Sequence, residues 1–282
     1  MKKGLVMEGG AMRGMFTAGV MDVLMEAGIE FDGAVGVSAG AAFGCNYKSR
    51  QIGRVIRYNS RFCADKRYSG IGPMLKEGNM FSTDFCYDVV PNQYDVFDFE
   101  AYEANPMEFY VVCTDVESGK PVYHNYTGFE DHGFDWIRAS ASMPLVSQMV
   151  EIDGAKYLDG GISDSIPLRF FESRGYDKNI VVLTQPADYV KKKNSLLPVL
   201  KAKYKKYPKL LEAMESRDII YNATLHYIAE KEKAGEIIVI RPECSLDIKK
   251  VEKDPEKLKA VYVCGRLAAS EKLSEIKKFL EE

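Results

Sequence analysis

The residues best suited to chemistry in this sequence are a serine set between two glycines and an aspartate followed by two glycines. Ser38 lies in the stretch AVGVSAGAAFG, with Gly36 and Gly40 two residues to either side. In a sharp turn from a strand into a helix, this spacing holds a nucleophilic serine above the sheet edge, because larger side chains at the glycine positions would collide. The stretch therefore predicts a nucleophile, with an ordinary helix N-cap as the alternative role of Ser38.

A second glycine-rich turn could stabilise the negative charge that forms when a serine attacks an ester. Residues 8–14 read EGGAMRG, follow an apolar strand pattern and open a helix. Backbone N–H groups in such a turn can face an anion. A single crossover joins this strand to the strand of Ser38, so the two can be neighbours in one sheet. The turn would then lie beside the serine.

A nucleophilic serine also needs a base. The three histidines, His124, His132 and His226, fall in a strand pattern, a polar loop and an amphipathic helix, where structural or solvated roles are the ordinary ones. Asp159, in YLDGG, ends a strand pattern, and the two glycines after it allow another backbone to approach closely. Asp-Gly is also a common turn, so Asp159 taken alone does not establish a base.

The elements that must position these residues predict an α/β fold. Strand and helix patterns alternate at the start of the chain: the strand GLVMEGG, a helix over 13–29 that stops near Gly28, the strand AVGVS, and a helix over 39–54. This order predicts a parallel sheet with right-handed crossovers. Further strands are predicted at MEFYVVCTDV and KPVYHN, joined around ESGK, on both sides of Asp153-Gly154, at NIVVLTQP and at EIIVIRP.

The remaining segments carry weaker patterns. Residues 53–106 are predicted to be irregular and to cover the sheet. The many aromatic and methionine side chains of residues 58–110 could line an acyl pocket or belong to the ordinary core. DWIRASASMP is predicted to form a helix that Pro144 ends. The last third of the chain is predicted to be otherwise helical.

Composition limits the classes of function. The 282 residues carry a formal net charge of −3, which argues against nucleic acid as a partner. There is no apolar run long enough for a transmembrane helix, and the apolar start of the chain ends at Glu8, too early for a signal peptide. Six scattered cysteines form no CxxC pair, which indicates buried free thiols and neither a metal site nor a disulfide framework. We therefore expect a cytoplasmic protein.

Three motifs together resemble the patatin-like phospholipase family, most strongly its bacterial members. They are Gly9 to Gly14, Gly36 to Gly40 and Asp159 to Gly161, and ASASMPLV at residues 139–146 also resembles the block that precedes the family's aspartate. The resemblance extends over roughly residues 3–186.

This resemblance implies a three-layer α/β/α patatin-like fold with a mainly parallel central sheet. Residues 1–186 would form the catalytic domain. Residues 187–282 would form a mainly helical C-terminal extension that contributes one further strand at about 236–242.

The resemblance also implies a serine–aspartate dyad that hydrolyses acyl esters of lipids, with Ser38 as the nucleophile and Asp159 as the general base. No metal or organic cofactor is implied. The oxyanion hole would come from the N–H groups of Gly9, Gly10 and Ala11, with Arg13 holding the turn or lending positive charge to an anionic substrate. The glycines that complete the motifs are Gly14, Gly36, Gly40, Gly160 and Gly161. The family usually has a third glycine where Ala11 stands, and alanine does not easily take a positive φ.

Other functions remain open from the residues alone. EGGAMRG resembles the Rossmann GxGxxG pattern with Ala11 at its middle glycine, and Glu30 or Asp32 could be the distant acid of a nucleotide-binding module. The chain order Ser38, Asp159, His226 fits an α/β-hydrolase triad. A non-catalytic regulator on a hydrolase scaffold is the third alternative.

Residues 190–211 carry eight lysines and no acidic residue, interleaved with Leu, Val and Tyr. Such a segment can lie on an anionic membrane surface, or it can be a solvated helix face balanced by acids elsewhere. A lipid or acyl-ester substrate and this membrane contact are the partners that the sequence suggests. The sequence does not indicate an oligomeric state.

Overall fold

A central sheet of eight strands organises the computed structural model, which describes residues 1–281. Its order is β5-β6-β3-β2-β1-β7-β8, and β4 also pairs with β3. The parallel part comprises β1 (Lys2–Met7), β2 (Gly33–Val37), β3 (Glu108–Asp115), β7 (Tyr176–Val182) and β8 (Ile237–Ile240). The antiparallel strands are β4 (Pro121–Asn125), β5 (Val150–Ile152) and β6 (Ala155–Asp159).

The two predicted hairpins are present. β3 and β4 pair antiparallel around the ESGK turn, and β5 pairs with β6 through a turn at Asp153 and Gly154. Both turn residues have positive φ, at 51° and 76°, as a two-residue hairpin turn requires. β8 falls within the strand predicted at 236–242.

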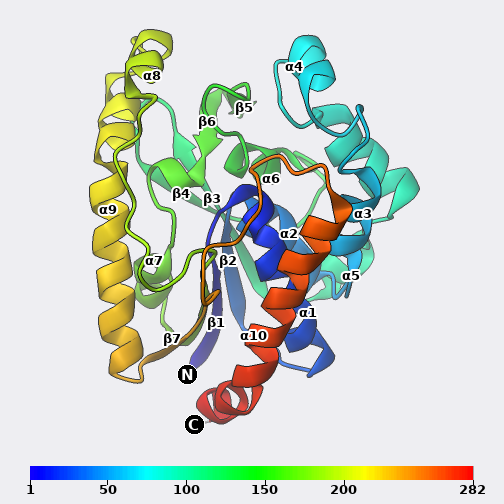
Figure 1. Cartoon of the computed structure of the whole chain (residues 1–282), viewed down its shortest axis with the longest axis vertical. Coiled ribbons are helices and arrows are strands. Elements are labelled where there is room, and N and C mark those ends of the chain that lie inside the picture. Colours follow the sequence, from blue (N-terminus) through cyan, green and yellow to red (C-terminus); the bar gives the residue numbers. More distant parts are fainter. Residues whose placement is uncertain (282) are drawn as a thin grey trace.

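Helices cover both faces of the sheet, which confirms the three-layer α/β/α architecture (Figure 1). One face carries α1 (Gly14–Glu26), α2 (Ala39–Lys48), α3 (Arg54–Phe62) and α10 (Pro255–Glu281), and the other carries α7 (Leu168–Ser173) and α9 (Pro208–Lys233). Successive residues of β1 serve different layers: Leu5 and Met7 join the core under α1 and α2, whereas Val6 joins the core under α7 and α9. Both faces are buried, so the central strands are apolar throughout rather than alternating.

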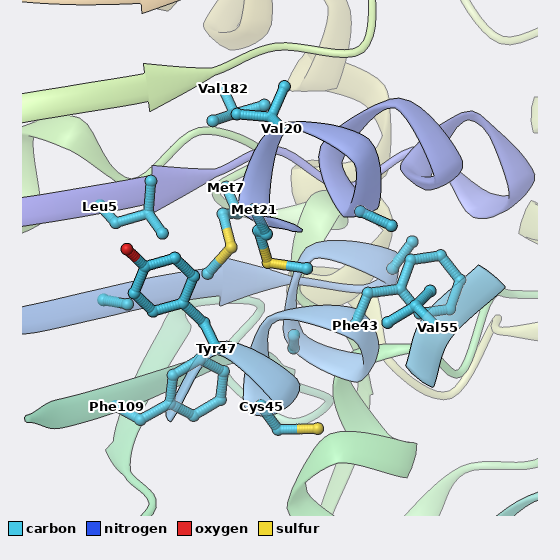
Figure 2. Close-up of a cluster of buried hydrophobic side chains, with 14 of the residues drawn as sticks. Leu5, Met7, Val20, Met21, Phe43, Cys45, Tyr47, Val55, Phe109 and Val182 are labelled. Carbon is cyan, nitrogen blue, oxygen red and sulfur yellow. The ribbon is translucent and has the colours of Figure 1, made fainter. Parts of the chain in front are cut away.

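The larger core lies between the sheet and the layer of α1, α2 and α3. Figure 2 shows Leu5 and Met7 of β1 and Phe109 of β3 facing Met21 of α1 and Phe43 of α2. Burying each side chain of this size stabilises the fold by about 1.5–3 kcal/mol. This packing sets the height of α1 and α2 above the sheet, and both helices begin at the predicted functional turns.

The C-terminal helix α10 lies directly against α1, and glycines allow the close approach. A Cβ atom at Gly19 of α1 would overlap the backbone carbonyl of Tyr262, and one at Gly265 of α10 would overlap the backbone carbonyl of Phe16. α10 therefore packs on the same layer as the N-terminal helices. The division of the chain after residue 186 stays a prediction.

Several predicted elements differ from the structure. Residues 53–106 are not irregular: they contain α3, α4 (Ile71–Glu77), the π-helix η2 (Phe85–Tyr94) and α5 (Phe99–Ala104). α4 and α5 are short, and Pro91 lies inside η2, so these three elements show no clear period. α3 does show one, because it buries Val55, Asn59 and Phe62 at helical spacing. The helix predicted over 39–54 ends at Lys48, because the chain turns through positive φ at Arg50 and Gly53.

The helix predicted to end at Pro144 is also shorter. α6 (Asp135–Ser140) stops at Ser140, and the chain turns at Ala141 directly after it. The shorter elements η1 (Ala11–Arg13), η3 (Gly160–Ile162) and α8 (Leu197–Lys203) complete the described chain. Within residues 1–281, none of the helices combines the length and the apolar character needed to span a bilayer.

Candidate active site

Ser38 occupies a strained turn between β2 and α2. Its backbone lies at φ 54° and ψ −118°, a conformation that side-chain-bearing residues rarely adopt, and its exposed fraction is 7%. The flanking glycines are sterically required: a Cβ atom at Gly36 would overlap the carbonyl of Gly40, and one at Gly40 would overlap the carbonyl of Met7. The local geometry is that of a nucleophile elbow.

Ser38 and Asp159 meet, although 120 residues of chain separate them. The Ser38 side chain lies close enough to the Asp159 carboxyl group to lower its pKa, and the carboxylate accepts the N–H of Gly161 at 2.8 Å. Asp159 ends β6, and β6 reaches β2 through β3, which lies between them in the sheet. Ser38 occupies the N-cap position of α2, but its side chain makes no capping hydrogen bond to this helix.

The Asp159 carboxyl group is almost fully buried, with an exposed fraction of 6%. Burial raises its pKa above the usual value, and this effect exceeds the lowering by the hydrogen bond from Ser38, by the charge of Arg217 and by the N–H of Gly161. A carboxylate with a raised pKa is a stronger base, which suits proton abstraction from an alcohol.

The glycine-rich turn after β1 passes beside Ser38, and β1 and β2 are parallel neighbours as predicted. A Cβ atom at Gly9 would lie 3.0 Å from the Ser38 Cβ atom. Sheet bonding ends at the Glu8 N–H, and the Arg13 N–H donates to the Gly10 carbonyl at 3.1 Å. The N–H groups between these two bonds lie outside both sheet and helix. Ala11 adopts φ 49°, the positive value that alanine disfavours.

The segment after α6 supports both predicted catalytic residues. The Ser38 N–H donates to the Ser140 Oγ atom at 2.8 Å, and this hydroxyl donates to the Val112 carbonyl at 2.6 Å. The Asp159 N–H donates to the Ser142 carbonyl at 2.9 Å. Both serines lie in ASASMPLV, so the motif signals the region, but the supporting contacts could not be read from the sequence.

Glu8 was not assigned a role from the sequence. Its buried carboxylate connects the end of β1 to the segment after β7 and to α9. It accepts the Thr184 N–H at 2.6 Å and the Tyr221 hydroxyl at 2.5 Å. Arg217, one turn before Tyr221 on α9, donates to the Gly161 carbonyl. These partners lie far apart in the chain, and no local pattern marks them.

An apolar cavity of about 120 Å³ opens beside Ser38. Ala11 lies at the Ser38 end of its lining, and much of the remaining wall comes from residues 54–91, within the segment whose aromatic and methionine residues suggested an acyl pocket. Representative lining side chains are Phe43, Tyr58, Tyr68, Phe81, Tyr87 and Phe134.

The histidines lie elsewhere. The His226 side chain is 76% exposed and lies 3.6 Å from Glu230, His124 stacks on Trp136, and His132 lies 3.3 Å from Asp153. In the described part of the chain, no histidine is a hydrogen-bond partner of the Ser38 side chain or of Asp159.

Cysteine burial is mixed. Cys45, Cys63 and Cys113 are buried as predicted, whereas Cys244 and Cys264 are exposed and Cys86 is partly buried. The exposed pair corrects the prediction, because both lie outside the packed layers. Across residues 1–281, no three His, Cys, Asp or Glu side chains are grouped as metal ligands would be.

Comparison with known proteins gives matches in both halves of the chain. The family model described as patatin-like phospholipase matches residues 5–171, and a domain of unknown function, DUF6363, matches residues 207–281. "Uncharacterized protein YjjU" of Escherichia coli is 30% identical over 200 residues, covering 65% of this chain and 52% of that protein. "Lysophospholipase nte1" of Aspergillus terreus is 30% identical over 186 residues, covering 62% of this chain and 11% of that protein.

"Uncharacterized NTE family protein Mb1092c" of Mycobacterium bovis is 27% identical over 179 residues, covering 63% of this chain and 48% of that protein. The matched region thus spans about half or less of each of these relatives. Among solved structures, "Crystal structure of VipD from Legionella pneumophila" aligns with a TM-score of 0.48 and 13% identity, over 97% of this chain and 67% of that one.

Proposed function

Because the chain belongs to the patatin-like phospholipase family, we propose that it is a serine hydrolase of lipid acyl esters in which Ser38 is the nucleophile and Asp159 the general base. The observation that carries this proposal is the strained turn that holds Ser38 beside the buried Asp159 carboxyl group. Relatives named lysophospholipases support a glycerophospholipid or lysophospholipid as the substrate class.

In the first half-reaction, Asp159 takes the Ser38 proton while the serine oxygen attacks the ester carbonyl carbon. The N–H groups of Gly10 and Ala11 donate to the oxyanion that forms, and each such donor contributes about 3 kcal/mol of transition-state stabilisation. The tetrahedral intermediate collapses, the alcohol leaves with the proton from Asp159, and the acyl group stays on Ser38. In the second half-reaction, Asp159 takes a proton from water, which attacks the acyl-serine. The fatty acid leaves, and the proton returns to the Ser38 oxygen.

The apolar cavity beside Ser38 supports binding of the acyl chain. Its wall of aromatic side chains begins at the serine and at Ala11, so an ester carbonyl placed at the turn has its acyl chain directed into the cavity. This arrangement separates the apolar half of the substrate from its headgroup.

The test is hydrolysis of p-nitrophenyl hexanoate by the wild type, Ser38→Ala, Asp159→Asn and His226→Ala. We expect the first two variants to lose at least about a thousandfold in kcat/KM, because each removes a member of the dyad. His226→Ala is expected to match the wild type. Loss of activity in His226→Ala with the fold retained would instead support a triad, and full activity in Ser38→Ala would contradict the nucleophile.

We also propose that the enzyme docks peripherally on anionic membranes with its active-site end. α4 and α8 stand at that end of the molecule, at either side (Figure 1). α4 exposes Ile71 and Leu75 by 78% and 82%, and α8 exposes Leu196 and Val199 by about half. The lysines of residues 190–211 lie around α8, where an anionic surface would attract them. Apolar side chains rimmed by lysines are typical of interfacial contact.

A further inference from the structure

Four basic side chains gather next to the proposed dyad, from four separate segments. Arg13 follows β1, Lys191 follows β7, Arg217 lies on α9, and Lys250 lies in the loop before α10. Lys191, Arg217 and Lys250 line one cavity of about 320 Å³, which Asp218 also lines. Across residues 1–281, none of the four forms an ion pair with a carboxylate. Cations outnumber carboxylates here, although the chain as a whole is acidic.

The cluster is built into the fold. The Lys191 backbone is held by the Asn222 side chain, which accepts its N–H at 2.8 Å and donates to its carbonyl at 2.9 Å. The Lys191 ammonium lies 4.3 Å from the ring centre of Tyr221, whose hydroxyl binds Glu8. Arg217 donates to the carbonyl of Gly161, in the turn that carries Asp159. Lys191 and Arg217 are therefore fixed relative to the dyad.

Two of these basic side chains, Arg13 and Lys191, lack the partners that normally stabilise a buried polar or charged group. The Arg13 Nε atom is buried and has no hydrogen-bond partner among the described residues. A buried donor without a partner is unfavourable. The pKa of Lys191 is lowered to about 8, mainly by burial and also by the charges of Arg217, Arg13 and Lys250, while the charge of Glu8 opposes them. An anion placed between these groups would satisfy the free donor and relieve the repulsion.

The topology independently indicates a ligand at this place. β1 and β7 are parallel neighbours, yet the chain leaves β1 through α1 on one face of the sheet and leaves β7 toward β8 through α9 on the other. In open α/β sheets, the crevice at the carboxyl ends of two such strands is the usual ligand site. Arg13 and Lys191 follow these two strands.

We infer that Lys191, Arg217 and Lys250, with the free donor of Arg13, bind the phosphate group of a glycerophospholipid headgroup while its ester lies at Ser38. This inference rests on the proposed function. The apolar cavity would hold the acyl chain and the basic cavity the headgroup, with the dyad between them. Lys191, Arg217 and Lys250 lie beyond the matched region 5–171, so the C-terminal part of the chain contributes to substrate recognition.

The test compares two monomeric, soluble substrates, dibutyroylphosphatidylglycerol and dibutyroylglycerol, so that membrane binding plays no part. We expect the double variant Lys191→Gln/Lys250→Gln to lower the ratio of kcat/KM for the phospholipid over the neutral ester about tenfold, mainly through KM. Lys191→Arg/Lys250→Arg should restore most of the ratio. Lys233→Gln is the matched control, since it removes an exposed lysine about 24 Å farther along α9 from Arg217.

A second measurement tests headgroup binding independently of ester hydrolysis. Binding of glycerophosphoglycerol and of inorganic phosphate to Ser38→Ala is measured by calorimetry, with and without the two glutamine substitutions. Loss of glycerophosphoglycerol binding in the substituted protein supports the headgroup site even if neither ester is cleaved. An unchanged substrate ratio, an equal loss on both esters, or substitution-sensitive binding of inorganic phosphate alone would overturn the inference.

Discussion

At the scale of single residues, the proposed base is a carboxyl group and not a histidine. Asp159 is an ordinary carboxyl whose basicity comes from where the fold places it: buried at the end of β6 and in contact with Ser38. Burial penalises the charged form, and the hydrogen bonds from Ser38 and Gly161 offset only part of that penalty. The same burial that makes Asp159 a better base also makes its ionised form unfavourable for folding.

The raised pKa of Asp159 predicts how activity depends on pH. The base must be ionised, so kcat/KM should rise as pH rises through this pKa and level off above it. The midpoint should lie above 3.8, the carboxyl group's usual value. A pH profile with p-nitrophenyl hexanoate measures it. A profile that is flat down to the pH of acid unfolding would contradict this role of Asp159.

As pH rises, ionisation of Asp159 should increase activity but decrease the stability of the folded state. Between its unfolded and folded pKa values the folded state binds more protons, so this residue's contribution falls as pH rises through that window. Asp159→Asn removes the effect. We expect the variant to be inactive but about 1 kcal/mol more stable than the wild type at pH 7, and to lose that advantage near pH 4. Urea unfolding at both pH values checks this.

At the scale of elements, the turns after β1 and β2 differ in the residue types that occupy their sterically constrained positions. The turn of Ser38 uses glycines at 36 and 40 because neighbouring backbone leaves no room for a Cβ atom. The turn after β1 places Ala11 at φ 49°, where glycine would fit without strain. The backbone at Ala11 thus adopts a conformation that alanine disfavours.

Replacing Ala11 by glycine should therefore stabilise the protein, although a glycine substitution usually destabilises it. Relief of the left-handed conformation contributes about 1–2 kcal/mol, and the added freedom of the unfolded chain opposes it by about 0.4–1 kcal/mol. We expect Ala11→Gly to stabilise the protein by about 0.5 kcal/mol. The control, Ala223→Gly on the exposed face of α9, should cost about 1 kcal/mol. Urea unfolding of both variants is the measurement, and equal destabilisation would argue against strain at Ala11.

At the scale of the whole molecule, the two ends of the chain share one layer. α10 packs on α1 through Gly19 and Gly265, and β8 extends the sheet beyond β7. α9 covers the other face and brings Arg217 and Tyr221 to the site. The last part of the chain therefore affects both the stability of the sheet layers and the surroundings of the dyad.

The contact between α1 and α10 predicts a sharp response at Gly265. An added methyl group would overlap the carbonyl of Phe16, so the two helices must separate. We expect Gly265→Ala to destabilise the protein by about 2 kcal/mol, although alanine is the better helix former. Ser270→Ala, on the exposed side of the same helix, should stay within about 0.5 kcal/mol of the wild type. Stabilisation by Gly265→Ala in thermal unfolding would show that the helices are not in close contact.

The proposed membrane contact predicts a difference between two exposed apolar surfaces. Ile71→Gln/Leu75→Gln on α4 should weaken co-sedimentation with vesicles of phosphatidylglycerol and phosphatidylcholine about tenfold, because it removes apolar area at the membrane-facing end. The control Val263→Gln/Leu267→Gln changes two apolar residues on α10 that are about half exposed, and it should bind as the wild type does. Equal binding by all three proteins would exclude α4 from the contact.

The sequence predicted the parts of this protein whose requirements are local. Glycines at 36 and 40 are needed by the turn of Ser38 itself, and apolar runs separated by turns define the strands, so the sheet and the α/β layers followed from pattern alone. Residues 53–106 were mispredicted: the helical spacing of α3 was missed, and two short helices and a π-helix containing Pro91 leave no regular period.

What the tertiary structure decided is which distant groups converge. Glu8 and Tyr221 are 213 residues apart, and Arg217 reaches the turn of Asp159 from another layer. Such contacts depend on how helices cross the sheet, and no local spacing encodes them. The sequence by itself therefore determined the two predicted catalytic residues and the layers that carry them. The burial that tunes Asp159, the cavity beside Ser38 and the basic cluster arise only when layers from both ends of the chain pack together.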